Sequence, residues 1–165
     1  MTIAVRSARP DDLHEAAKLA AALVREHHAY DPLRFMCIEP LEEGYERFLR
    51  SQVDREGVVL IVAAARERTV ETIVGYLLAT LEDRDWSDLR DACGKIHDVY
   101  VEASVRRRGV ASHLVEEAVS RLTAMGAPRV VLMAASQNEK ARHLFERLGF
   151  RPTMVEMTRE AGPRA

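Results

Sequence analysis

The stretch of sequence that decides the fold runs from Val99 to Ser112 and reads VYVEASVRRRGVAS. A short apolar run of strand character is followed by the arginines Arg106–Arg108, then by Gly109 and a run with helical spacing. Backbone N–H groups at a helix start point outward, and the helix dipole places partial positive charge there. Such a turn binds phosphate, and arginines add charge-assisted hydrogen bonds to phosphate oxygens. We therefore expect a phosphate-bearing ligand here, against the alternative that the small residues only allow helix packing and the arginines are solvated.

Two familiar phosphate-binding patterns do not occur around this turn. A Walker loop requires a GxxxxGK[ST] stretch, which the sequence lacks. A dinucleotide fingerprint needs three glycines after the first strand of the fold, whereas Gly109 is a single glycine that follows an internal strand. The turn therefore predicts neither a Walker-type nucleotide site nor a dinucleotide site.

Bulk composition is that of a globular protein. Of the 165 residues, 47% are hydrophobic and 30% are charged, which fits one ordinary domain, expected over residues 1–165. The net charge of −2 and the lack of a long apolar run give no reason to expect a nucleic-acid or membrane partner. Cys37 and Cys93 form no disulfide framework, and the N-terminus does not resemble a secretory signal, so we expect a cytoplasmic location.

Periodicity along the chain predicts alternating strands and helices. The clearest helix follows Gly109 and ends at Gly126, and Ser136 with Glu139 resembles a capping box at the start of a shorter helix. Two earlier helices are expected, one from Pro10 and one over Leu41–Val53, and the segment His27–Met36 between them is expected to form a loop or short helical turns. The expected strands are Thr2–Ser7, Val58–Ala65, Thr72–Leu81, Lys95–Glu102, Arg129–Ala134 and Met154–Thr158. This order predicts a mixed α/β sheet of about six or seven strands.

Three motifs in the second half of the chain resemble those of the GNAT superfamily of N-acetyltransferases. The run Arg106–Ala111, RRRGVA, matches the family pattern [QR]xxGx[GA]. Asn138–Ala141 resembles its NxxA, and Phe145–Phe150 resembles its closing YxxxGF. Order and spacing agree over Ile96–Phe150, and the likeness extends over nearly the whole chain. The resemblance implies a mostly antiparallel sheet of six to seven strands, flanked by about four helices, in which a splayed parallel strand pair forms an acyl-CoA cleft.

The resemblance also implies that acetyl-CoA binds as the acyl donor, with no metal. In the family it lies between two parallel strands, which here are Lys95–Glu102 and Arg129–Ala134. By position, the turn holds the pyrophosphate, the preceding strand pairs with the pantetheine arm, and Phe145 lies beside the thiol end. The cofactor-binding residues implied in this way are Val99, Tyr100, Val101, Arg106, Arg107, Arg108, Gly109, Val110, Ala111, Ser112, Asn138, Ala141 and Phe145.

Acetyl transfer to an alkyl amine needs a group that removes a proton, because such amines are mostly ammonium ions at pH 7. The resemblance implies that the catalytic base comes from the position of His97, and a histidine has a pKa in the right range. Asp98 is the second candidate for the base. Neighbouring side chains of a strand point to opposite faces, so His97 and Asp98 are expected on different sides of the sheet. A bulge in this strand would change which side chains face the cleft. A lone histidine on a strand is more often structural, and that interpretation stays open. Backbone N–H groups near Val99–Val101 are candidates for stabilising the oxyanion.

One departure from the family pattern concerns the leaving group. Many members carry a tyrosine, which protonates the departing thiolate, where this chain has Phe145. Water, Tyr100 or Tyr30 is then left to supply the proton. The departure also admits a second class of function, an acyl-CoA-binding regulatory module with little or no turnover. The first expectation is an acyltransferase that moves an acetyl group from acetyl-CoA to a primary amine by direct attack on the thioester.

The resemblance puts the acceptor pocket at the first two helices and the neighbouring loops. The adjacent histidines His27 and His28 have no third ligand at the spacing of a metal-binding motif. A pair of surface side chains is therefore a simpler interpretation than a metal site. Asp83 and Asp85 offer negative charge to a cationic amine, or form a solvated acidic loop. A small amine, an antibiotic, an amino acid and a peptide N-terminus all remain open as acceptors. Because dimers are common in such families, we also expect a homodimer. The expected pocket residues are His27, His28, Tyr30, Asp31, Arg34 and Trp86.

Overall fold

Five strands form one sheet in the computed structural model, which describes residues 1–162. The strands are β1 (Thr2–Ser7), β2 (Val58–Glu67), β3 (Val70–Glu82), β4 (Cys93–Val101) and β5 (Val130–Leu132). Their order across the sheet is β1-β2-β3-β4-β5, so each strand lies beside its neighbour in sequence. The first four pair antiparallel, and β5 pairs parallel to β4. The predicted mixed and mostly antiparallel sheet is confirmed.

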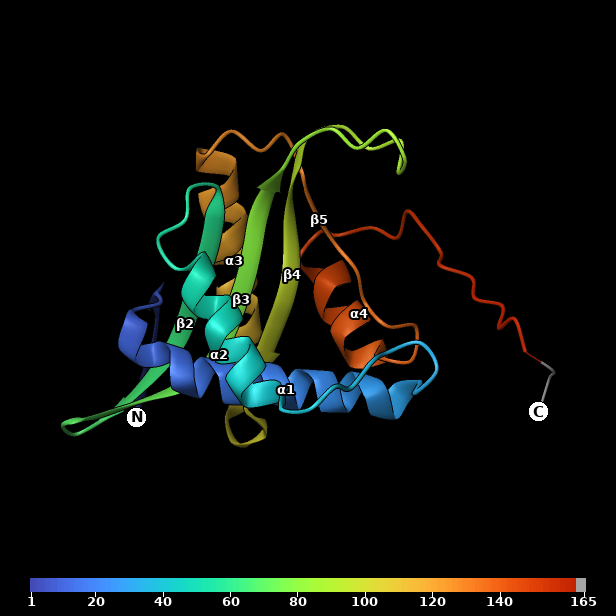
Figure 1. Cartoon of the computed structure of the whole chain (residues 1–165). Helices are drawn as coiled ribbons and strands as arrows, with labels where there is room; N and C mark the ends of the chain where they lie inside the picture. Colours follow the sequence, from blue (N-terminus) through green and yellow to red (C-terminus); the bar gives the residue numbers. More distant parts are fainter. Residues whose placement is uncertain (163–165) are drawn as a thin grey trace.

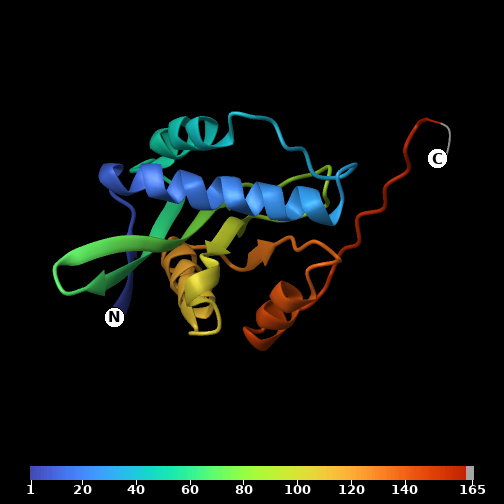
Figure 2. The ribbon, with the colours of Figure 1, turned by 90° about the horizontal axis from the view of Figure 1, so that it is seen from below.

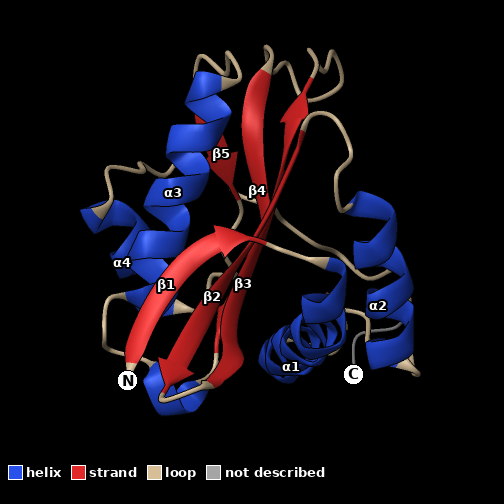
Figure 3. Ribbon diagram, turned by 90° about the vertical axis from the view of Figure 1, so that its left-hand side faces the viewer, coloured by secondary structure: helices blue, strands red, loops and turns tan. Residues whose placement is uncertain are grey.

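Within the same residues, four α-helices cover the two faces of the sheet (Figure 1). They are α1 (Leu13–Tyr30), α2 (Leu41–Gln52), α3 (Val110–Ala124) and α4 (Glu139–Arg147), and short 3-10 turns at Pro10–Asp12 and Ala103–Val105 precede α1 and α3. Figure 2 shows α1 and α2 on one side of the strands and α3 and α4 on the other, and Figure 3 shows the strands between these layers. Each face has its own hydrophobic cluster. In the described part of the chain, no helix has the length and apolar character that a bilayer crossing requires.

Helix α3 shows how the sequence fixes this packing. Its apolar residues recur three or four positions apart, and Val110, Leu114 and Leu122 are all buried. Leu122 lies against Gly94 of β4, where an added Cβ would come within 2.8 Å of the leucine Cδ1. A glycine is therefore needed at that point of β4 for α3 to approach the sheet.

The parallel pairing of β4 with β5 is short. It runs from Gly94 opposite Val130 to Ile96 opposite Leu132 and stops there. Strand β4 continues to Val101, whereas the chain after β5 moves away from β4 toward α4 (Figure 1). Within residues 1–162, the β5-facing edge of β4 therefore has no strand partner beyond Ile96.

The predicted last strand at Met154–Thr158 is wrong. Residues 151–162 run as an exposed segment outside the sheet, and Met157 is 90% exposed. The sheet of the described residues therefore has five strands rather than the expected six or seven. An alternating pattern makes a strand only where an open edge receives it, and the free edge of β5 does not pair with this segment.

Two helix boundaries also differ from the prediction. Helix α1 continues to Tyr30, so the first part of the expected loop His27–Met36 is helical. Helix α4 is capped by Asn138, whose Oδ1 accepts a hydrogen bond from the Ala141 N–H at 3.2 Å. The expected capping box at Ser136 is therefore wrong by two positions.

Candidate functional site

The turn that precedes α3 exposes a run of backbone N–H groups. Within residues 1–162, the amides of Arg107–Ser112 donate to no protein acceptor, and the next amide, that of His113, donates to the Gly109 carbonyl at 3.0 Å. Gly109 has a φ of 78° and Arg107 has a φ of 63°, so left-handed residues direct the main chain into the helix start. Free amides at a helix start, with the helix dipole behind them, form an anion-binding site.

The arginines of this turn differ in what their side chains contact. Arg107 and Arg108 are exposed and make no ion pair among the described residues. Arg106 points back to the protein: its Nε donates to the Val101 carbonyl at 2.9 Å, and its terminal nitrogen donates to Glu26 Oε1 at 2.7 Å. All three arginines are expected at the phosphate turn, but in the fold Arg106 is engaged by the protein, whereas Arg107 and Arg108 have no ion-pair partner among the described residues.

Glu26 of α1 ties the first helix to this turn. The Tyr100 hydroxyl donates to the same Glu26 Oε1 at 2.7 Å, and the Arg106 guanidinium lies over the Tyr100 ring, 5.0 Å from its centroid. Burial, together with the Glu26 carboxylate, raises the pKa of Tyr100 to about 12. Burial works to raise the pKa of Glu26, but the hydrogen bonds from Arg106 and Tyr100 hold that pKa below its ordinary value. The Tyr100 hydroxyl is thus committed to α1 and not to a leaving group.

The unpaired edge of β4 presents main-chain polar groups close to the turn in sequence. The Glu102 N–H donates to the Val74 carbonyl of β3 at 2.9 Å, which fixes the direction of the amides along β4. Alternation then points the polar groups of Tyr100 toward β3 and those of Val99 and Val101 toward the unpaired edge. The Val101 carbonyl already accepts from Arg106 Nε, so a ligand with amide groups is left with the main-chain groups of Val99 and the N–H of Val101 to pair with, as an added strand would.

Strand β4 contains a bulge at His97. Its neighbours Ile96 and Asp98 pair with Ala79 and Leu78, which are consecutive residues of β3, so His97 has no partner in the ladder. The extra residue interrupts the alternation of the strand. As a result, the side chains of His97 and Asp98 both line one cavity, although strict alternation separates them.

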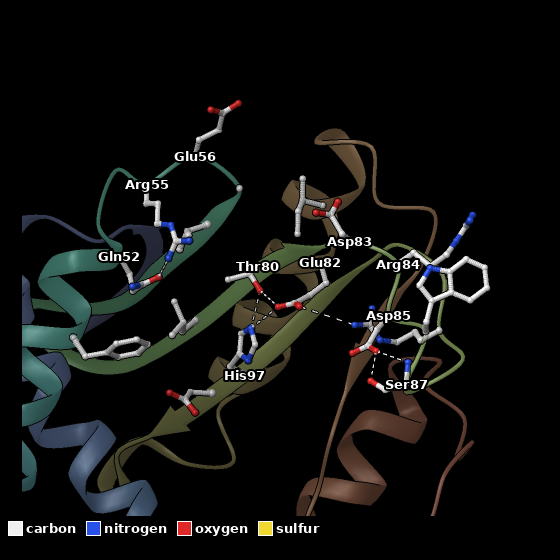
Figure 4. A pocket seen from close by; sticks show the side chains of 18 of the residues that line it. Gln52, Arg55, Glu56, Thr80, Glu82, Asp83, Arg84, Asp85, Ser87 and His97 are labelled. Atoms are coloured by element: carbon white, nitrogen blue, oxygen red, sulfur yellow. Dashed lines mark hydrogen bonds and ion pairs between the residues drawn. The ribbon is translucent and has the colours of Figure 1, made fainter.

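A cavity of about 930 Å³ lies beside this bulge (Figure 4). Its walls come from α2, the turn before β2, the last part of β3, the loop between β3 and β4, and the bulge. Asp83, Asp85 and Trp86 of the predicted acceptor site lie in its lining. Sequence reasoning missed the α2 residues, because their spacing indicates only an amphipathic helix; they are Tyr45, Phe48 and Gln52.

The other predicted acceptor residues lie elsewhere. They belong to the segment from His27 to Arg34, at the end of α1 and in the loop after it, and none of them lines the cavity. His27 Nδ1 lies 2.9 Å from the Leu23 carbonyl, and His28 Nδ1 lies 2.7 Å from the Phe35 carbonyl. Across residues 1–162, His, Cys, Asp and Glu side chains form no group of three or more that is suited to a metal ion.

His97 contacts two polar residues of β3, and the three side chains point toward one another (Figure 4). Its Nε2 lies 2.7 Å from Thr80 Oγ1 and 3.4 Å from Glu82 Oε1. The Thr80 hydroxyl donates to Glu82 Oε1 at 2.6 Å, and this hydrogen bond lowers the pKa of Glu82. Burial lowers the pKa of His97 below its ordinary value, and the Glu82 carboxylate opposes that change. An imidazole that is neutral near pH 7, with its side chain 33% exposed, is suited to accept a proton.

Asp98 lies among phenol groups on the same cavity. Burial raises the pKa of its carboxyl above the ordinary value for aspartate. Tyr76 occupies the diagonal position on β3, and its buried hydroxyl acts on the pKa of the Asp98 carboxyl against the effect of burial, although it has no hydrogen-bond partner within 3.5 Å in residues 1–162. Burial and the nearby Asp98 charge raise the pKa of Tyr45 to about 12. The carboxyl therefore carries its negative charge less readily than an exposed aspartate does.

The remaining predicted cofactor residues belong to α4 and its cap. Asn138 uses Oδ1 to cap the helix at Ala141, so its side-chain NH2 group is the part left for a ligand. Phe145 is 7% exposed, and its ring packs edge-on against Phe150 with 6.0 Å between centroids. Phe145 therefore belongs to the hydrophobic core, and it has no hydroxyl to offer a leaving group.

The splayed strand pair and the anion-binding turn together define the architecture of an α/β acyltransferase. The chain belongs to the acetyltransferase (GNAT) family, whose model matches residues 21–150. The family expected from the three sequence motifs is thereby confirmed.

Known proteins resemble the chain in part of its sequence or in its fold. A mycothiol acetyltransferase from Beutenbergia cavernae is 35% identical over 82 residues, which are 49% of this chain and 26% of that protein. The matched region thus spans about a quarter of the length of this curated relative. A tetramutant of the BH1408 protein from Bacillus halodurans has a TM-score of 0.81 at 22% identity, over 95% of this chain and 99% of that one. The aminoglycoside N-acetyltransferase AAC(6')-Iy in complex with CoA has a TM-score of 0.75 at 16% identity, over 98% and 96% of the two chains. At these identities, the two structures show a shared fold.

Proposed function

We propose that this protein transfers an acetyl group from acetyl-CoA to a primary amine of an acceptor molecule. The observation that carries the proposal is the run of unpaired amides from Arg107 to Ser112, which follows the unpaired edge of β4 in the chain. A CoA ester has a pyrophosphate, which suits an anion-binding helix start. It also has a pantetheine arm with amide groups, which suits a strand edge.

The residues expected to hold acetyl-CoA follow from this match. The pyrophosphate is expected at the turn, the pantetheine arm along β4, and the thiol end toward α4. From the turn onward, the expected contacts are the amides of Arg107–Ser112 with the side chains of Arg107 and Arg108, the main chain of Val99 and Val101, the Asn138 side chain, and the apolar side chains of Ala141 and Phe145.

His97 is the proposed catalytic base. An acceptor amine that enters the cavity as an ammonium ion gives one proton to the imidazole, and its nitrogen then attacks the thioester carbonyl carbon. As the C–N bond forms, main-chain N–H groups near Val99–Val101 stabilise the oxyanion. The C–S bond then breaks, and the second amine proton reaches the leaving sulfur through water, because Phe145 has no hydroxyl. The products are the acetylated amine and CoA, with one proton held by His97 and later released.

The cavity beside the bulge is the proposed acceptor site. The carboxylates of Glu82 and Asp83 in its lining favour an ammonium group. Asp98 is kept as the second candidate for the base, because it lines the same cavity and burial raises its pKa toward the range of a proton acceptor.

Calorimetry with acetyl-CoA, followed by a thiol-release assay over a panel of amines, tests the proposal. We expect saturable acetyl-CoA binding and thiol release that depends on at least one amine, with kcat reduced about 100-fold or more in His97→Ala. Absence of acetyl-CoA binding would overturn the proposal. An unchanged rate and pH profile in His97→Ala would remove His97 as the base and leave Asp98, tested by Asp98→Asn.

A second function, an acyl-CoA-binding regulatory module, is favoured by one observation. Phe145 stands where the family pattern has tyrosine, and it is buried in the core. Acetyl-CoA binding without turnover on any amine of the panel would favour this alternative over the transferase.

A further inference from the structure

Two residues outside the predicted site control the hydrogen bonding of His97. Thr80 and Glu82 lie on the same strand, two positions apart, and their side chains meet the imidazole from β3 (Figure 4). The Thr80 Oγ1 to His97 Nε2 distance is 2.7 Å, and the Thr80 Oγ1 to Glu82 Oε1 distance is 2.6 Å. Neither residue is among the site residues expected from the sequence.

The protons carried by the side chains determine which atom donates in the Thr80–Glu82 and Thr80–His97 hydrogen bonds. The pKa of Glu82 is lowered, so its carboxylate is ionised at neutral pH and can only accept. The Thr80 hydroxyl has a single proton, and it donates that proton to Glu82 Oε1. Thr80 Oγ1 therefore presents a lone pair to His97 Nε2, and the other atom close to Nε2 is the Glu82 oxygen at 3.4 Å. Facing two acceptors, Nε2 has to carry the proton.

We propose that Thr80 and Glu82 are positioning residues that hold neutral His97 as the Nε2–H tautomer and leave Nδ1 as the atom that takes the proton of the acceptor amine. The proposal rests on the proposed function, in which His97 is the base. It extends that function by naming the reacting nitrogen and the two residues that select it.

The same pair stabilises the imidazolium ion that proton transfer creates. When Nδ1 gains a proton, the positive ring faces the Glu82 carboxylate through Nε2–H. The other charged groups near the ring are Lys95 and Asp98 on β4, which lower and raise the pKa of His97 respectively. From the β3–β4 loop, Arg90 approaches the second Glu82 oxygen at 4.0 Å, so each carboxylate oxygen has its own partner. Tyr45 of α2 also lines the cavity, and its pKa of about 12 keeps it neutral. The other titratable groups of the lining are Arg55 and Glu56 before β2 and Asp83, Arg84 and Asp85 after β3.

An NMR titration of protein labelled with ¹⁵N-histidine tests the tautomer without any acceptor. His97→Ala assigns the ring signals. We expect the neutral wild-type ring to show a protonated Nε2 and an unprotonated Nδ1. Glu82→Gln removes the carboxylate that opposes the effect of burial, so the His97 pKa falls below that of the wild type. A neutral ring that carries its proton on Nδ1, or a Glu82→Gln titration that matches the wild type, overturns the proposal.

A second experiment measures kcat and KM with the amine that gives the fastest thiol release. Thr80→Val keeps the shape of the side chain and removes the hydroxyl, and we expect kcat to fall about 10-fold with KM changed less than about twofold. Thr80→Ser restores the hydroxyl, and kcat returns to within about twofold of the wild type. Equal rates for Thr80→Val and Thr80→Ser overturn the positioning role. Circular dichroism melting and acetyl-CoA affinity, both expected to match the wild type, separate this effect from misfolding.

The two proposals fail in different ways. If His97→Ala retains wild-type activity, the base assignment fails whatever the titration shows. If His97→Ala is inactive while Glu82→Gln titrates as the wild type and Thr80→Val keeps its rate, the positioning role fails and the proposed base stands. If no amine is turned over, the titration alone still decides which nitrogen of His97 carries the proton.

Discussion

The turn before α3 and the cavity beside the β4 bulge are built from different parts of the polypeptide. The turn offers main-chain amides from one continuous segment, Arg107–Ser112, with the exposed side chains of Arg107 and Arg108 added. The cavity is lined by residues from several parts of the chain, among them His97 and Asp98, the two candidates for the proposed base. We therefore expect ligand binding at the turn to depend on backbone conformation, and the proposed chemistry in the cavity to depend on side-chain pKa and hydrogen bonding. Substitutions that affect one region and not the other sharpen this distinction.

The largest effect is expected from Gly109→Val in the turn. A Cβ at Gly109 would meet no heavy atom within 4 Å, so the substitution introduces no clash. Its φ of 78° is strained for a β-branched residue by about 1–3 kcal/mol, which corresponds to about a 5- to 150-fold weaker Kd for acetyl-CoA if the turn rearranges. Calorimetry measures the Kd. Gly44→Ala is the control, since Gly44 lies within α2 with no heavy atom near its Cβ position. Wild-type affinity in Gly109→Val would show that the turn does not bind the ligand.

A smaller loss of affinity is expected from Arg108→Glu. Charge reversal at an exposed residue beside the free amides should weaken acetyl-CoA binding about 10-fold at low ionic strength. Because exposed charges are screened, the difference should shrink in about 0.5 M salt. Arg66→Glu, at the far end of β2, serves as the matched control and should bind as the wild type. If neither the substitution nor the added salt changes the Kd, Arg108 does not contact the ligand.

Two tyrosine-to-phenylalanine substitutions, one beside the turn and one beside the cavity, compare the two regions by their effect on thermal stability. The Tyr100 hydroxyl donates to Glu26 beside the turn, and its removal should cost about 1 kcal/mol, or about 2–4 °C in Tm. The Tyr76 hydroxyl is buried beside Asp98, with no hydrogen-bond partner within 3.5 Å in the described residues, so Tyr76→Phe should lower Tm less than Tyr100→Phe does. Thermal melting of both variants checks the contrast. Equal losses would mean that Tyr76 has a partner as good as Glu26.

The smallest effect is expected from Asp98→Asn, and it depends on pH. Burial raises the folded-state pKa of Asp98, so the native state favours the protonated form. That contribution to stability is fully present below the unfolded-state pKa and is lost as the pH rises through the folded-state pKa. The variant should therefore gain Tm relative to the wild type as the pH is raised from about 4 to 8, by at most about 2–4 °C. The exposed Asp83→Asn is the control, expected to stay within about 1 °C of the wild type at both pH values. A constant offset across the pH range would contradict the burial effect.

The sequence predicted what depends on local pattern. The spacing of Val110, Leu114 and Leu122 identified α3, and the left-handed Gly109 marked its start. The sheet class and the helix start with its unpaired amides followed from the same segment. Each of these features is determined by residues within about one helical turn or a few strand positions of one another, so the pattern contains the information.

The sequence could not predict what depends on contacts between distant segments. The ion pair of Arg106 with Glu26 could not be predicted, because it forms only when α1 is brought beside the turn. The cap of α4 is Asn138 rather than Ser136, although both residue types cap helices, because the path of the chain after β5 decides which one reaches the first turn. The alternating residues at Met154–Thr158 have strand character, but the free edge of β5 does not pair with them. The location of the bulge at His97 is set by the register of β3, and no glycine marks it.

The bulge also determines which face of β4 each neighbouring side chain occupies. Without His97, the remaining residues alternate regularly: Ile96, Val99 and Val101 pack in the α3-facing cluster, and Asp98 stays on the cavity side. His97 is thus one extra residue that adds an imidazole to the cavity while its neighbours keep the orientation of a regular strand. Deleting His97, rather than replacing it, is therefore expected to leave a regular strand with Asp98 still facing the cavity.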